Sequence, residues 1–92
     1  MNKNDLQERM TAFAVRIISM VDALPPTLGA QTVARQVVRS GTSPSANYRA
    51  ACIAKSDKDF LNKLKMVEEE LDETCHWIDI IMRCQMLKSS RI

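Results

Sequence analysis

The sequence predicts an all-α protein, an up-down antiparallel bundle of the four-helix-bundle type, forming one domain over residues 1–92. Only two glycines and three prolines occur among the 92 residues, and residues that favour helix are common. Apolar residues recur at steps of three and four over long stretches. No useful length of chain alternates apolar and polar residues with period two, so no strands are expected.

The first helix is predicted from an apolar seam with the a/d spacing of a bundle, formed by Leu6, Met10, Phe13, Ile17, Met20 and Leu24. Asn4 is expected to cap its start, because Gln7 follows three residues later in a capping-box arrangement. The Leu24-Pro25-Pro26 sequence ends the helix, since a residue before proline avoids the α region.

The second helix is predicted to begin near Thr27 or Leu28. It carries the broad apolar stripe of a core-facing helix, at Ala30, Val33, Ala34, Val37 and Val38. Gly41 suits the position that follows a helix C-terminus. Ser43 before Pro44 suits an N-cap with proline at the first helical position. We therefore expect one long helix that is kinked or broken once near Gly41–Pro44.

The third helix has its start signal at Ser56, with Asp59 three residues later. Its seam follows at steps of four and three, through Phe60, Leu64, Val67, Leu71, Thr74, Ile78, Ile81 and Gln85. Roughly 30 residues give a rod of about 45 Å. The tail Lys88–Ile92 resembles the cap of a further helix, but the sequence stops there. The fourth helix of the bundle is therefore expected to be missing or very short.

Cysteine usage and the N-terminus predict a cytoplasmic protein. Three cysteines cannot all pair within one chain, and reduced thiols are typical of the cytoplasm. The first ten residues, MNKNDLQERM, lack the apolar centre of a signal peptide. No apolar run approaches the roughly 20 residues that span a bilayer, so no membrane association is expected.

Charge is segregated along the chain, although the net charge is only +2. Residues 23–56 contain no acid and four bases, Arg35, Arg39, Arg49 and Lys55. Residues 66–82 contain no base and six acids, Glu68, Glu69, Glu70, Asp72, Glu73 and Asp79. Such a pattern indicates either outside partners or two segments that face each other.

The hairpin predicted around Ser56 allows the second explanation for two of the arginines. Arg39 would fall opposite Thr74, beside the glutamates, and Arg35 opposite Ile78, near Asp79. Pairing with these acids and binding of an anionic partner both stay open for Arg35 and Arg39. Better candidates for nucleic-acid binding lie near the turn, where acids are few: Arg49, Lys55, Lys58, Lys63 and Lys65.

Other polar residues receive structural interpretations. Ser43 and Asn47 are expected to cap a helix or to bond backbone groups freed by a kink. Tyr48 is expected to be buried with its hydroxyl at the rim, because four aromatic residues make no stacking platform. Cys75 and His76 are adjacent and point about 100° apart on a helix, which is no metal-ligand spacing. No catalytic residue, metal or cofactor is expected.

Two segments carry a resemblance to a known family. RSGTSPSANYRA (39–50) and SDKDFLNKLKMVEEELDETCHW (56–77) resemble small bacterial four-helix bundle proteins named for intervening sequences in 23S ribosomal RNA genes. The accessory variability proteins of diversity-generating retroelements share that fold. The resemblance covers about residues 6–88 and implies ring-shaped homo-oligomers, typically pentamers. It also implies nucleic-acid binding through basic residues, without catalytic activity.

The resemblance can be followed by position. The second-helix motif is matched by Arg39, Ser40, Ala46, Asn47, Tyr48 and Arg49. The third-helix motif is matched by Asp59, Phe60, Lys63, Leu64, Glu70, Leu71, Glu73 and Trp77. Two departures are Ala50, which stands where the family often has glutamate, and the absent fourth helix.

Together these observations predict a non-enzymatic, oligomeric helical bundle that binds nucleic acid, RNA or DNA, through a basic surface. The alternative is a protein-interaction scaffold, for example an accessory subunit of a reverse transcriptase, with no direct role in nucleic-acid binding. The apolar side of the third helix would then matter most, because no fourth helix covers it.

Overall fold

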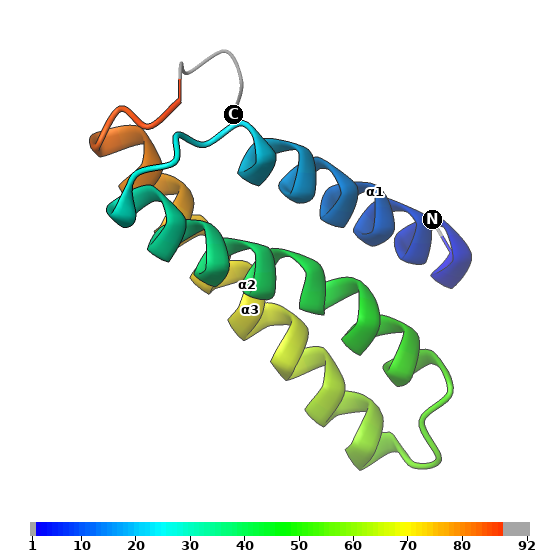
Figure 1. The fold of residues 1–92 in the computed structure, drawn as a ribbon. Helices are drawn as coiled ribbons and strands as arrows, with labels where there is room; N and C mark the ends of the chain where they lie inside the picture. Colours follow the sequence, from blue (N-terminus) through cyan, green and yellow to red (C-terminus); the bar gives the residue numbers. More distant parts are fainter. Residues whose placement is uncertain (1, 88–92) are drawn as a thin grey trace.

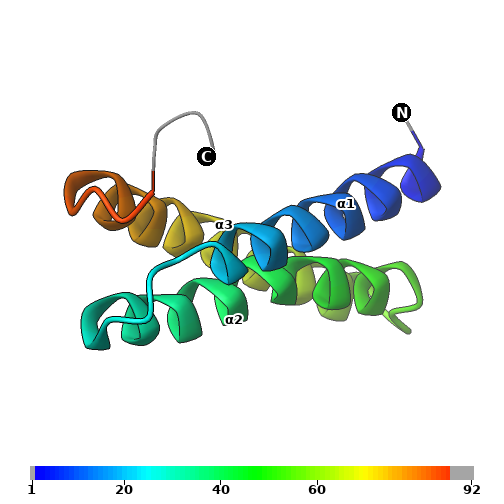
Figure 2. The same ribbon diagram turned by 45° about the horizontal axis from the view of Figure 1, so that its top comes forward.

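The structure is a computed structural model that describes residues 2–87. It contains three helices, α1 (Lys3–Asp22), α2 (Leu28–Cys52) and α3 (Asp57–Arg83), and no strand within those residues. The helices pack antiparallel into a body of 44 × 21 × 17 Å. α1 and α3 each lie along α2 and scarcely touch one another (Figures 1 and 2). The all-α prediction is therefore confirmed. None of the helices is long and apolar enough to cross a membrane.

Each helix begins at a side-chain cap. Thr27 caps α2 by accepting a hydrogen bond from the Ala30 amide at 3.2 Å, so the helix begins where the sequence predicts. Ser56 likewise caps α3 through the Asp59 amide at 3.0 Å.

The predicted cap of α1 is wrong by two residues. Asn2, not Asn4, accepts from the Asp5 amide at 2.9 Å, and the Asp5 carboxylate accepts from the Asn2 amide at 3.2 Å. Asn2 and Asp5 satisfy two backbone donors reciprocally, and that arrangement places Asn4 inside the first turn. The helix ends at Asp22, two residues before Leu24, with Ala23 as its C-cap.

α2 runs without a break through the predicted interruption. Gly41 does not have a positive φ, so it is not a helix-ending residue, and Ser43 is not an N-cap. Pro44 lacks the amide that would bond to the Ser40 carbonyl. The Ser43 hydroxyl lies 3.5 Å from that same carbonyl and partly replaces the lost donor. The predicted capping role of Ser43 is therefore wrong, and its contact to the freed carbonyl is long.

Gly41 owes its place to close packing between α1 and α2. It is buried, and a Cβ atom at this position would lie 2.8 Å from both Cγ1 and Cγ2 of Ile17. Those distances are well inside van der Waals contact, so only glycine lets the two helices approach this closely here. The residue permits a helix crossing rather than a helix end.

The core lies in the half of the molecule that is remote from the α2–α3 turn. Ile17 and Met20 of α1, Val33 and Val37 of α2, and Ile81 of α3 are buried together. Trp77 and Ile78 are among the partly buried residues that pack against this cluster. Nearer the α2–α3 turn fewer apolar residues are buried, among them Tyr48, Ala51 and Val67.

α3 ends in a Schellman motif, which corrects the predicted seam at its last position. Gln85 has a φ of 55° and is exposed, so it is a left-handed cap residue and not a seam residue. The Met86 amide bonds to the Ile81 carbonyl at 3.0 Å, and the Gln85 amide bonds to the Met82 carbonyl at 3.1 Å. Met86 then packs back on the core. The predicted cap over Lys88–Ile92 lies outside the described residues.

Candidate nucleic-acid interface

The middle of the α2–α3 pair holds an interhelical cluster of ion pairs centred on Arg39. Its guanidinium lies 3.1 Å from the Glu70 carboxylate and also bonds to the Glu73 carboxylate. The Glu73 carboxylate accepts a further hydrogen bond, of 3.0 Å, from the Trp77 indole nitrogen. Glu70, Glu73 and Trp77 share one side of α3 because they follow each other at steps of three and four.

The pairing that the sequence allowed for Arg39 is therefore confirmed. The Arg39 side chain is 49% exposed, so solvent screens the cluster and each pair contributes only about 0–1 kcal/mol to stability. The electrostatic consequence is larger than the energetic one. Two carboxylates surround this guanidinium, and little of its charge is left for an outside anion.

Arg35, one turn earlier on α2, is in a different situation. It is exposed, and no carboxylate of residues 2–87 lies within 4 Å of it. Asp79, its expected partner, pairs instead with Arg83 on the next turn of α3 at 3.1 Å. The pairing considered for Arg35 is thus absent from the described part of the chain. Whether Arg35 binds nucleic acid stays a prediction.

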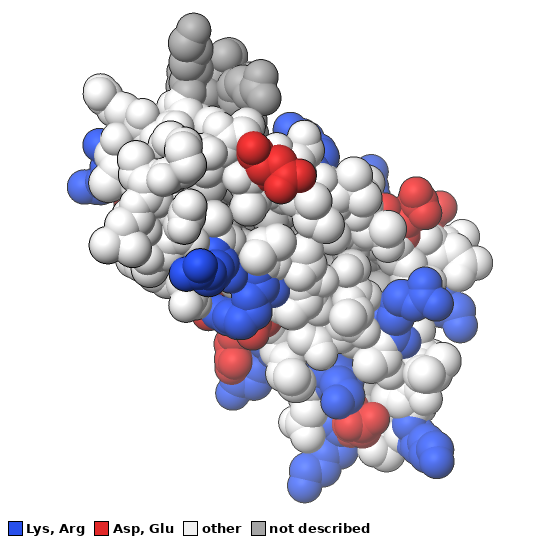
Figure 3. Space-filling model, in the orientation of Figure 1, with Lys and Arg blue, Asp and Glu red and all other residues white. Residues whose placement is uncertain are grey.

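The remaining candidate residues lie at the end of the molecule that carries the α2–α3 turn. We call them the basic end: Arg49, Lys55, Lys58, Lys63 and Lys65. Arg49 is in the last turn of α2, Lys55 in the connection, and the three other lysines in the first turns of α3. Lys63 is half-buried and the other four side chains are exposed. Figure 3 shows basic side chains gathered at this end around a smaller acidic patch.

No residue of the basic end forms an ion pair within residues 2–87. Asp57 and Asp59, which flank Lys58, belong to the first turn of α3, where the helix dipole favours negative charge. From Lys63 to Glu70 the helix rises by about 10 Å, a little more than the Debye length at physiological salt. Glu70 is therefore too distant to cancel the charge of Lys58 or Lys63. Glu68 and Glu69 follow Lys65 by three and four residues, but neither forms an ion pair with it.

The three remaining motif residues of α2 lie within the helix. Ser43 and Asn47 are half-buried, and neither caps a helix end. The predicted capping role of Asn47 is therefore wrong, since α2 does not end before it. Tyr48 is buried, as predicted, at 7% exposure. Burial raises the pKa of the Tyr48 hydroxyl above its ordinary value of 10.0, and the neighbouring Cys52 thiol adds to the shift.

The fold also brings together residues that the sequence patterns did not connect. Because α1 runs antiparallel to α2, Lys3 lies beside the last turn of α2 and the first turn of α3. The signal that places it there is the antiparallel order of the helices. Residues 2–87 contain no group of three or more His, Cys, Asp or Glu side chains placed to hold a metal ion.

Comparisons with known proteins give one sequence family and a similar solved structure. The sequence profile of the family described as "23S rRNA-intervening sequence protein" matches residues 2–92. A crystal structure of a protein of unknown function, from the S23 ribosomal protein family of Bacteroides thetaiotaomicron, is similar with a TM-score of 0.90 and 33% identity. That match covers 99% of this chain and 81% of the other. No curated protein matches the chain in sequence.

Proposed function

Because this chain belongs to the 23S rRNA-intervening sequence protein family, we propose that it is a non-enzymatic, oligomeric helical protein that binds RNA at its basic end. One observation carries the proposal. Five cations converge on one end of the molecule, and none of them is paired within residues 2–87. Arg39, by contrast, is held by two glutamates. Unpaired cations grouped on one surface are the usual basis of phosphate binding.

The basic end suits recognition by shape and charge more than by sequence. Lysine is a compact point charge on a flexible stem, and four of the five cations are lysines. Contacts of this kind position a protein on the phosphate backbone without reading the bases. We further propose a cytoplasmic location, which the three unpaired cysteines support.

Binding should be measured as the affinity for a structured RNA hairpin at rising salt. If about four of the five cations contact phosphates, the affinity should fall by about 150-fold between about 50 and 200 mM salt. The double variant K63E/K65E should lose most of the binding. The matched control is R9E/R16E, which changes the net charge equally through two exposed arginines of α1.

Two outcomes would contradict the proposal. One is affinity that does not change with salt. The other is equal weakening by K63E/K65E and R9E/R16E, because overall charge would then matter and the basic end would not. A DNA hairpin of the same sequence serves as a second probe, and tighter binding to DNA would change the proposed ligand from RNA to DNA.

Exposed apolar residues favour a second candidate function, a protein-interaction scaffold that assembles with copies of itself or with another protein. Met66 and Met82 on α3 are 43% and 48% exposed. Methionine-rich apolar surface is adaptable and is common at protein interfaces. Sedimentation equilibrium of M66S/M82S should show loss of self-association. If that variant also binds RNA normally and RNA does not change assembly, the two functions are separate.

A further inference from the structure

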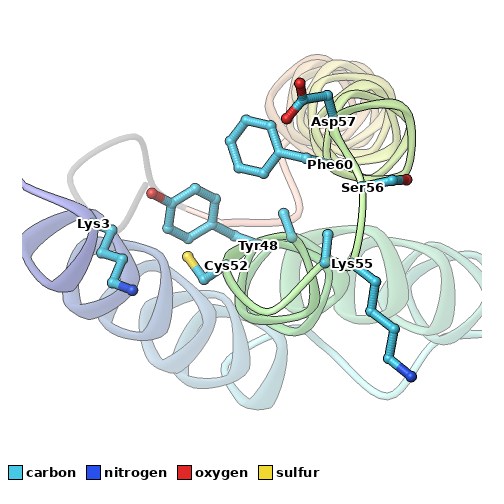
Figure 4. Close-up of a pocket in the computed structure, with 9 residues that line it drawn as sticks. Lys3, Tyr48, Cys52, Lys55, Ser56, Asp57 and Phe60 are labelled. Atoms are coloured by element: carbon cyan, nitrogen blue, oxygen red, sulfur yellow. The ribbon is translucent and has the colours of Figure 1, made fainter.

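A pocket opens where the start of α1, the end of α2 and the start of α3 meet. Its volume is about 410 Å³, within the range of pockets that hold small ligands. Seven of its lining residues carry rings or polar groups: Lys3, Tyr48, Cys52, Lys55, Ser56, Asp57 and Phe60 (Figure 4). The pocket adjoins the basic end, because Lys55 belongs to both.

Two aromatic rings reach this pocket from different helices. Figure 4 shows the rings of Tyr48 and Phe60 close together between the helices. Tyr48 is buried and therefore held in place by packing, while Phe60 is 38% exposed. The small side chains of Ala51 and Ala54 leave space beside the rings. A partly exposed ring at the wall of a pocket offers an aromatic face to a flat ligand.

The polar groups around the pocket are of mixed character. Lys3 supplies a cation, Asp57 a carboxylate, and Tyr48 a hydroxyl that burial keeps protonated. Lys3 and Asp57 do not pair with each other or with any described residue. A purely apolar ligand would leave these groups without partners, which disfavours a lipid tail. A ligand with a flat ring, hydrogen-bonding edges and a phosphate would use all three kinds of group.

We propose that this pocket takes one unstacked base of an RNA, with the base against Phe60 and its phosphate toward Lys3. The carboxylate of Asp57 accepts hydrogen bonds from the amino group of a base, as acidic side chains do in nucleic-acid complexes. This proposal rests on the proposed function and makes it more specific. The basic end would hold the backbone, and the pocket would select an RNA that presents an unpaired nucleotide.

The test compares two RNA hairpins that differ in one base. The first has a single unpaired nucleotide in its stem, and the second has an abasic residue at the same place. Stacking of one base on an aromatic side chain corresponds to a preference of about 5- to 150-fold for the first hairpin. F60A and F60L should reduce this preference to about one, while affinity for the abasic hairpin stays unchanged. F60Y should keep the preference because it keeps the ring.

Leu61→Ala is the matched control, because Leu61 is an exposed neighbour that does not line the pocket. Circular dichroism checks that each variant folds, and F60L retains the bulk of the side chain if F60A does not fold. Equal, salt-dependent binding of both hairpins by the unaltered protein would overturn the base pocket and leave the proposed function standing. Binding of neither hairpin would overturn both. A preference that F60L retains would also overturn the base pocket.

Discussion

The hydroxyl groups of Ser40 and Thr74 lie 2.9 Å apart in the buried interface between α2 and α3. Both residues are almost completely buried, and within residues 2–87 Tyr48 is the only other buried side chain that carries a polar group. The Thr74 hydroxyl also lies 2.8 Å from the Glu70 carbonyl, whereas the Ser40 hydroxyl has only a long contact of 3.5 Å to the Val37 carbonyl. Ser40 therefore depends on Thr74 for its hydrogen bond more than Thr74 depends on Ser40.

This asymmetry predicts unequal effects of removing either hydroxyl. Thr74→Val leaves the buried Ser40 hydroxyl without a good partner, so we expect a loss of about 1–3 kcal/mol in the free energy of unfolding. Ser40→Ala leaves Thr74 bonded to the Glu70 carbonyl, and we expect a loss of about 0.5–1.5 kcal/mol. Chemical denaturation of both variants and of the double variant measures the coupling. If the double variant loses the full sum of the two effects, the hydroxyls are not coupled.

Gly41 and Gly29 form a matched pair for testing close helix packing. Both are in α2, and alanine gains up to about 1 kcal/mol of helix propensity over glycine at either place. A Cβ atom at Gly29 meets nothing within 4 Å, so G29A should be stabilised by about 0.5–1 kcal/mol. At Gly41 the added carbon collides with Ile17, whose branched side chain is buried and stiff.

We therefore expect G41A to be destabilised despite its better helix propensity. Overpacking costs about 1–3 kcal/mol, which equals or exceeds the propensity gain of up to about 1 kcal/mol. Thermal unfolding of G41A, G29A and the unaltered protein gives the comparison. The loss caused by G41A should be smaller in an Ile17→Ala background than in the unaltered protein, because alanine lacks both Cγ atoms that the added carbon meets. Equal stabilisation by G41A and G29A would refute close packing at Gly41.

Substitutions of Arg39 and Arg49 are expected to have different effects: one lowers the stability of the fold and the other lowers the affinity for RNA. R39Q removes the partner of two glutamates and should lower the free energy of unfolding by about 0.5–1 kcal/mol, less at high salt. Its affinity for RNA should change little. R49Q removes the same charge from the basic end, so the slope of log affinity against log salt should fall by about 1. Equal loss of RNA affinity in both variants would show that Arg39 still binds RNA although it is paired with two glutamates.

Tyr48 makes the stability dependent on pH in the alkaline range. Burial of its hydroxyl raises the pKa of Tyr48 above 10.0, because the charged phenolate loses its hydration. The unfolded chain therefore releases this proton at lower pH than the folded chain does. The stabilising contribution is complete below about pH 10 and is lost as the pH rises through the folded-state pKa.

Tyr48 is the sole tyrosine, so tyrosinate absorbance reports it alone. The midpoint should lie above pH 10 in the folded protein and return to about 10 in denaturant. Y48F isolates the effect on stability, because the two proteins differ only in this hydroxyl. The difference in unfolding free energy between the two proteins should depend on pH only above about pH 10. A folded-state midpoint at or below 10 would contradict burial as the dominant cause.

The approximate extent of the helices and the cap of α3 could be predicted because these features depend on near neighbours in sequence. Thr27 and Ser56 each bond an amide three residues later, and such contacts need no other helix. Asn4 was the wrong cap because Asn2 with Asp5 forms a reciprocal pair in the same stretch. Asn2 and Asn4 both fit the pattern of an N-cap residue. Asn2 is the cap because Asn2 and Asp5 form two reciprocal hydrogen bonds.

Gly41 and Pro44 show where local signals mislead. Each residue is typical of a helix boundary, yet both are buried inside α2. Contact with α1 favours continuing the helix, and the Ser43 hydroxyl reduces the effect of the missing proline amide. Tertiary packing therefore outweighs the local preference, which amounts to a few kcal/mol at most.

The amino-acid sequence by itself determined three amphipathic helices, their antiparallel order and the grouping of positive charge near the α2–α3 turn. Those features follow from periodicity, caps and composition, which act over a few residues. The tertiary structure alone decided that Arg39 has ion-pair partners among residues 2–87 while Arg35 has none there, and that Lys3, Tyr48 and Phe60 meet at one pocket. Such contacts depend on how far each helix slides and rotates against its neighbour, and side-chain packing across the whole interface sets that register.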